Sequence, residues 1–106
     1  MDPALPHAAA SDVVTATIRQ DVDVATAPDV AAYLRQVVRP GSRVVLDMSE
    51  VTFMDCAGLS EILAAYRRAA EGGGWVRLAS VQRGPRRVIE LTRTQRLLAG
   101  PDGSCG

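Results

Sequence analysis

The sequence predicts an α/β fold in which helices pack against a small, mixed but mostly parallel β-sheet. Short runs rich in β-branched residues alternate with longer segments whose apolar residues recur at helical spacing. The resulting order is strand, helix, strand, helix, strand, helix, which is typical of crossover units with right-handed connections. One run, at residues 44–46, is continuously apolar, as expected of a central strand covered on both faces.

The first strand and first helix are predicted between residues 13 and 38. Apolar and polar residues alternate through 13–19, as in a half-buried strand. The inward-facing residues of this strand are Val14, Ala16 and Ile18. A helix then begins after Thr26, a candidate N-cap, with Pro28 in its first turn, and the Pro-Gly pair at 40–41 ends it.

The second strand is predicted at 44–48, and a further apolar run at 51–54 leads into a corner at Asp55. The helix that follows ends at three glycines, 72–74. Its predicted inner face consists of Leu59, Ile62, Leu63, Tyr66 and Ala70. A third strand is expected at 75–79, and Gly84-Pro85 opens a third helix whose apolar residues are Val88, Ile89 and Leu91.

The length and the ends of the chain predict one domain between two flexible segments. A chain of 106 residues is large enough for one hydrophobic core and too small for two. The domain is expected at residues 12–98, preceded by a flexible leader at 1–11 and followed by a glycine- and proline-rich flexible tail at 99–106.

Charge and hydropathy disfavour nucleic-acid and membrane partners. The 12 acidic residues balance the 12 basic ones, so no net field attracts phosphates. No apolar stretch approaches the roughly 20 residues of a membrane span, and the leader lacks the features of a secretory signal. We therefore expect a cytoplasmic protein without a membrane span.

The sequence does not favour an enzyme, a metal site or a cofactor. A cysteine nucleophile needs a base, and the sole histidine, His7, lies in the leader. The acidic residues Asp21, Asp23, Asp47 and Asp55 fall on separate turns and helix ends, where capping explains them better than metal binding does. An arginine cluster is expected to form a solvated helix face or part of a partner surface: Arg83, Arg86, Arg87, Arg93 and Arg96.

The strand-to-helix corner at 55–59 is the candidate site. Asp55 can cap the unpaired N–H groups of the helix start, and the small Ala57 and Gly58 leave this end open to a partner protein or an anion. The simpler interpretation, from these residues alone, is that Asp55 is only an N-cap and Cys56 a small core residue.

The segment VLDMSEVTFMDCAGL, residues 45–59, resembles the central motif of STAS domains, in particular those of bacterial anti-sigma factor antagonists. In that family an apolar strand ending in Asp-Leu-Ser leads to Asp-Ser-Ala/Ser-Gly-Leu. The stretch Asp21-Val22-Asp23 is similar to the family's Gly-Glu-Leu-Asp turn, with Gln20 in place of the glycine. The resemblance extends over roughly residues 12–98 and implies a STAS-like fold.

The resemblance also implies a function by partner switching. A family antagonist binds an anti-sigma factor, usually a protein-serine kinase, and thereby releases a sigma factor; phosphorylation of the motif serine abolishes that binding. The partner-binding residues implied here are Asp23, Asp55, Cys56, Ala57, Gly58 and Leu59. The alternative is a STAS subunit that docks a transporter or a lipid-trafficking complex through the same corner.

Two departures from the family pattern change the expected regulation and assembly. Cys56 replaces the phosphorylated serine, so the protein is either permanently able to bind or controlled by oxidation of Cys56, including a bridge to Cys105. The family's usual additional terminal strands are not evident, which predicts an open sheet edge and a possible homodimer.

Overall fold

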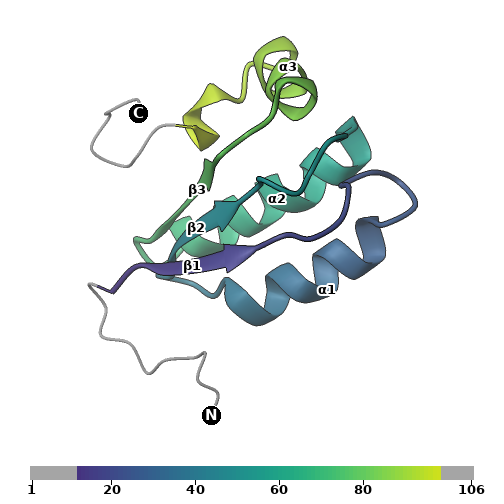
Figure 1. Ribbon diagram of the computed structural model, residues 1–106. Coiled ribbons are helices and arrows are strands. Elements are labelled where there is room, and N and C mark those ends of the chain that lie inside the picture. Colours follow the sequence, from purple (N-terminus) through teal and green to yellow (C-terminus); the bar gives the residue numbers. More distant parts are fainter. Residues whose placement is uncertain (1–11, 99–106) are drawn as a thin grey trace.

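The computed structural model describes residues 12–98, which form an α/β unit (Figure 1). The predicted leader and tail, His7 and Cys105 lie outside these residues. The elements follow the predicted order: β1 (Val14–Thr17), α1 (Ala27–Val37), β2 (Arg43–Asp47), α2 (Cys56–Ala70), β3 (Trp75–Ala79), α3 (Arg83–Leu91) and a short 3-10 helix, η1 (Gln95–Leu97).

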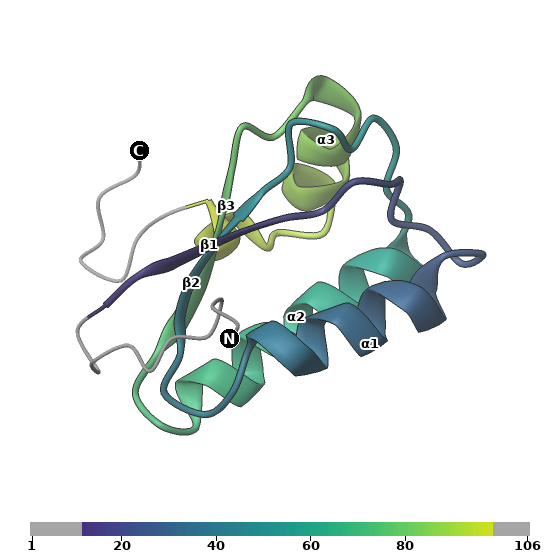
Figure 2. The ribbon, with the colours of Figure 1, turned by 60° about the horizontal axis from the view of Figure 1, so that its bottom comes forward.

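The three strands form one sheet in the order β1-β2-β3, and both pairings are parallel. Val44 of β2 aligns with Val14 of β1 on one side and with Val76 of β3 on the other. Helices α1 and α2 contact each other and lie side by side on one face of the sheet (Figures 1 and 2). Consecutive right-handed crossovers that advance in one direction place their helices on the same face, which explains this arrangement.

β2 is the central strand, as predicted, but only one of its faces is fully covered. Val44 and Leu46 are buried against the helices, whereas Val45 is half-buried on the opposite face. The prediction of a strand covered on both faces was therefore wrong. An apolar run cannot show on which face each helix will pack, because that depends on the strand order.

The inner faces of the helices differ in part from the predicted ones. Leu59 and Ile62 of α2 are buried as expected, but the face continues through Ala65 and Ala69, and Ala70 is exposed. Ala65 and Ala69 lie about one and two helical turns after Ile62. Ala69 and Ala70 both fit the apolar spacing of the helix, so only contact with the other elements determines which of these two is buried.

The predicted apolar face of α3 extends one residue too far. Val88 is half-buried and Ile89 is fully buried, whereas Leu91 is exposed. Pro85 supplies the other buried side chain of this helix.

The two edges of the sheet differ. After α3 the chain returns to β3, where η1 contacts the strand and the guanidinium of Arg96 lies 5.4 Å from the ring centre of Tyr66 on α2. On the other side, β1 has no strand partner besides β2 within residues 12–98. None of the helices in this part of the chain has the length and hydropathy needed to cross a membrane.

Candidate protein-binding site

The loops that follow β1 and β2 meet at one end of the sheet. Parallel neighbours end at the same edge, so the chain leaving β1 passes beside the chain leaving β2. The apolar run at 51–54 forms no strand here; it makes a single parallel bridge, in which Met54 pairs with Val22. The N–H of Val22 donates to the carbonyl of Phe53 at 3.0 Å, and the N–H of Asp55 donates to the carbonyl of Val22 at 3.1 Å.

Asp55 holds both the start of α2 and the neighbouring loop. Its Oδ1 accepts the Gly58 N–H at 2.9 Å, so the predicted N-cap role is confirmed. Its Oδ2 accepts the N–H of Val24 at 3.1 Å, a contact between residues 31 positions apart. Both carboxylate oxygens are therefore occupied by main-chain donors, and Asp55 acts as a structural anchor of the corner.

Asp21 makes the reciprocal connection from the first loop to the second. Its Oδ1 accepts the backbone N–H of Thr52 at 2.8 Å, the hydroxyl of Thr52 at 3.0 Å and the N–H of Phe53 at 3.1 Å. The Thr52 N–H bond is the main reason that the pKa of Asp21 lies below 3.8; the small desolvation of the carboxylate opposes it. We call Asp21 and Asp55, which join the same two loops in opposite directions, the carboxylate clasp.

Asp23 shapes the turn that leads into α1. Its Oδ1 accepts the N–H groups of Ala25 and Thr26, each at 3.0 Å. Thr26, predicted to cap α1, makes no side-chain bond to that helix; its hydroxyl donates to the Asp21 carbonyl at 2.7 Å and accepts the Asp23 N–H at 3.0 Å. Thr26 occupies the predicted N-cap position, and its carbonyl accepts the N–H of Val30 at 2.9 Å, but its side chain does not cap the helix because the hydroxyl binds within the preceding turn.

Gly58 and Leu59 lie inside the corner. A Cβ added to Gly58 would stand 2.1 Å from the carbonyl oxygen of Val22, so only glycine allows α2 to approach the first loop this closely. The Leu59 side chain is 3% exposed and belongs to the core. Of the predicted binding residues, these two support the surface from below, and Ala57 is half-buried beside them.

The exposed part of the corner is apolar. Cys56, the first residue of α2, is exposed with a free thiol, so its predicted alternative as a core residue was wrong. Val24 is 70% exposed and Phe53 is 52% exposed. Val24 donates its N–H to Asp55, and Phe53 lies two residues before Asp55 in the chain. We call Val24, Phe53 and Cys56 the apolar patch.

Sequence reasoning missed two members of the apolar patch and one of the carboxylate clasp. Val24 could have been suspected because it is an apolar residue between the predicted strand at 13–19 and the helix that begins after Thr26. Phe53 was assigned to a strand, and only its place in a loop exposes it. Asp21 was treated as a solvated turn residue, since no local pattern indicates a partner 31 residues away.

The chemistry of the corner suits binding. The carboxylates of Asp21, Asp23 and Asp55 accept main-chain N–H groups, which leaves them poorly placed as catalytic bases. Within the described part of the chain, no three His, Cys, Asp or Glu side chains are grouped as a metal site would require. Arg83, Arg86 and Arg87 lie exposed along α3, apart from Arg96, whose guanidinium lies over Tyr66.

The fold and the corner are those of a STAS domain. The STAS domain family model matches residues 7–101, nearly the whole chain, and the chain therefore belongs to this family. The fold is also similar to the crystal structure of a candidate anti-sigma factor antagonist from Thermotoga maritima, with a TM-score of 0.70 and 22% identity over 82% of this chain and 76% of that one. At this identity, the likeness supports the fold.

Proposed function

We propose that this STAS domain is an anti-sigma factor antagonist, which binds an anti-sigma factor of the serine-kinase type and thereby releases a sigma factor for transcription. The observation that carries the proposal is the exposed apolar patch, held in place by the carboxylate clasp, at the motif that resembles the antagonists. In this role the protein is a binding module and acts in the cytoplasm, where sigma factors meet RNA polymerase.

The proposal is supported by an exposed apolar surface whose backbone is held in place by hydrogen bonds. A partner that covers Phe53 and Val24 removes apolar area from water, and the hydrogen bonds of Asp21 and Asp55 reduce the ordering needed on binding. The carboxylates of Asp21, Asp23 and Asp55 lie around the patch. We infer that the partner presents an apolar centre with a basic rim.

Cys56 changes how this binding is controlled. The residue is exposed at the position of the family's phosphorylated serine, but a thiol is not the acceptor of a serine kinase. We infer that the protein stays able to bind in the presence of active kinase and ATP. Oxidation of the thiol is the competing mode of control, and the binding test separates the two.

The test is calorimetric titration of the full-length protein with the anti-sigma kinases encoded in the same genome. Phe53→Ala should weaken binding about tenfold or more, as expected for an aromatic residue at the centre of an interface. Glu71→Ala, at the exposed C-terminal end of α2 and so at the opposite end of that helix from the corner, should change the affinity less than about twofold. If no candidate kinase binds, the antagonist function is wrong, and a STAS subunit of a transport or lipid-trafficking complex becomes the better interpretation.

Control by covalent modification is tested with the same kinase. Cys56→Ser should become phosphorylated and lose binding, because the phosphate adds charge and bulk beside Asp55, whereas the wild-type protein should gain no phosphate by intact mass. Binding by wild-type protein should be the same with reductant and after mild peroxide. A loss of affinity after peroxide that reductant reverses, and that Cys56→Ala lacks, would establish redox control instead.

A further inference from the structure

The outer edge of β1 is open within the described residues and carries unpaired strand groups. β1 pairs with β2 alone, and the N–H of Ile18 donates toward β2, to the Asp47 carbonyl at 3.2 Å. Since N–H directions alternate along a strand, those of Thr15 and Thr17 point away from β2. A strand edge of this kind can pair with another strand.

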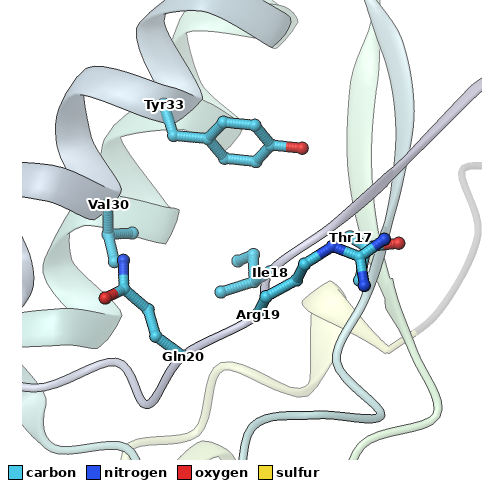
Figure 3. Close-up of a pocket in the computed structure, with 6 residues that line it drawn as sticks. All are labelled: Thr17, Ile18, Arg19, Gln20, Val30 and Tyr33. Carbon is cyan, nitrogen blue, oxygen red and sulfur yellow. The ribbon is translucent and has the colours of Figure 1, made fainter.

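A hollow lies next to the carboxyl end of this edge. It encloses about 340 Å³ between α1 and the chain that leaves β1. Figure 3 shows Tyr33 and Val30 on α1, across from Ile18, Arg19 and Gln20 of that chain. The lining residues are Thr17, Ile18, Arg19, Gln20, Val30 and Tyr33.

The charges and shape of the edge fit a second copy of the same chain in antiparallel orientation. Asp12 precedes β1 and Arg19 follows it, so a two-fold axis near Thr15 brings the acidic end of each β1 close to the basic end of the other. Asp12 already takes part in an interaction within its own copy, so the pairing depends on the charge of Asp12 and not on an unoccupied carboxylate. Arg19, whose side chain is 72% exposed, bonds Glu50 through one terminal nitrogen, and its guanidinium has further donors. A parallel pairing would instead place like charges side by side.

We propose that two copies form a symmetric dimer by antiparallel pairing of their β1 edges around Thr15. In this register, Val13 of one copy, which is exposed, lies opposite Thr17 of the other, and residues 12–13 of each copy lie next to the hollow of its partner. The interface is isologous, so the same contacts are made twice. Because β1 has four residues, the dimer is weak, with a dissociation constant between about 1 µM and 1 mM.

The first test is sedimentation equilibrium of the full-length chain across that concentration range. The average mass should rise from 11.2 kDa toward twice that value. Thr15→Pro removes an outward-pointing N–H and leaves the β1–β2 hydrogen bonds in place, so it should weaken the dimer at least about tenfold. Thr15→Val, which keeps the N–H, should dimerise like wild type. A wild-type protein that stays monomeric near 1 mM overturns the proposal, and is the result expected if the chain's own residues 1–11 cover the edge.

Disulfide trapping tests the interface even if the proline variant fails to fold. In a background of Cys56→Ser and Cys105→Ser, Thr15→Cys should give a covalent dimer on oxidation, because directly opposed residues of an antiparallel pair are about 5.5 Å apart at Cα. Asp29→Cys, exposed on α1, is the matched control and should remain monomeric. Equal trapping by the two variants, or trapping by Asp29→Cys alone, contradicts pairing through β1.

Discussion

Gly58 determines how closely α2 can approach the loop that follows β1. In an exposed helix, Gly→Ala adds about 1 kcal/mol of stability, because alanine has less conformational freedom to lose. Here the added Cβ would lie 2.1 Å from the Val22 oxygen and 2.4 Å from its carbonyl carbon. These are backbone atoms that Asp55 and Phe53 hold through hydrogen bonds, so the clash cannot be relieved by a side-chain rotation.

Gly58→Ala should therefore destabilise the protein, by about 2–4 kcal/mol, despite its favourable helix propensity. Urea unfolding followed by circular dichroism measures the change. Cys56→Ala, two residues earlier on the exposed side, is the matched control and should stay within about 0.5 kcal/mol of wild type. A Gly58→Ala protein as stable as the control would show that the corner can open without cost.

Leu59 and Phe53 should separate stability from binding. Leu59→Ala creates a cavity in the core and should cost about 2–4 kcal/mol of unfolding free energy. Phe53→Ala removes a ring that is 52% exposed and should cost less than about 1 kcal/mol, while it weakens partner binding. Urea unfolding and calorimetric titration of the same two variants test this separation. It is contradicted if Phe53→Ala lowers the free energy of unfolding as much as Leu59→Ala does.

At the scale of elements, the carboxylate clasp turns two loops into one surface. Asp21 reaches from the first loop to Thr52 and Phe53, and Asp55 reaches back to Val24. Between them, the Val22–Met54 bridge continues the parallel pairing beyond the ends of β1 and β2. The apolar patch is thus attached to the sheet by hydrogen bonds on both of its sides.

Asp21→Asn should loosen this connection without unfolding the protein. The amide keeps an acceptor oxygen but loses the charge that strengthens three bonds, so we expect a loss of about 1 kcal/mol at this partly exposed position. Hydrogen exchange at the Thr52 and Phe53 amides should become faster, because both donate to Asp21. Glu90→Gln, exposed on α3, should leave exchange at these amides unchanged.

At the scale of the whole molecule, α1 and α2 cover one face of a three-stranded sheet, and the two edges of the sheet have different neighbours. η1 contacts β3, while β1 is unpaired on its outer side within residues 12–98. Carboxylates at the loop ends of this sheet accept main-chain N–H groups, among them Asp47, which accepts the N–H of Ser49 at 2.9 Å. The resistance of the fold to acid therefore depends on these carboxylates.

Stability should fall as the pH drops below about 4. Hydrogen bonds from Thr52 to Asp21 and from Ser49 to Asp47 lower the pKa of each carboxylate from 3.8. A lowered pKa in the folded state means that unfolding takes up protons, so this stabilisation is present above pH 3.8 and is lost as the pH falls through the lower folded pKa values. Urea midpoints measured from about pH 6 down to about pH 2 should decrease, and less steeply in Asp21→Asn. An equal pH slope in wild type and Asp21→Asn would contradict the contribution of Asp21.

The order of strands and helices, the N-cap at Asp55 and the place of the candidate corner between the second strand and the second helix followed from the sequence alone. Each depends on local information: alternation of apolar residues, helical spacing and a motif within 15 consecutive residues. The buried choice of Ala69 over Ala70 and the exposure of Leu91 did not follow, because both fit the local spacing and only packing distinguishes them.

The tertiary structure decided how the corner is held and what it exposes. Asp21 meets Thr52 and Asp55 meets Val24 across 31 residues, and Gly58 is constrained by the carbonyl of Val22. No pattern in the chain encodes such pairs, because they arise only when β1 and β2 align in register and bring their following loops together. The sequence therefore determined where the corner lies in the chain, and the parallel pairing of two strands determined its shape.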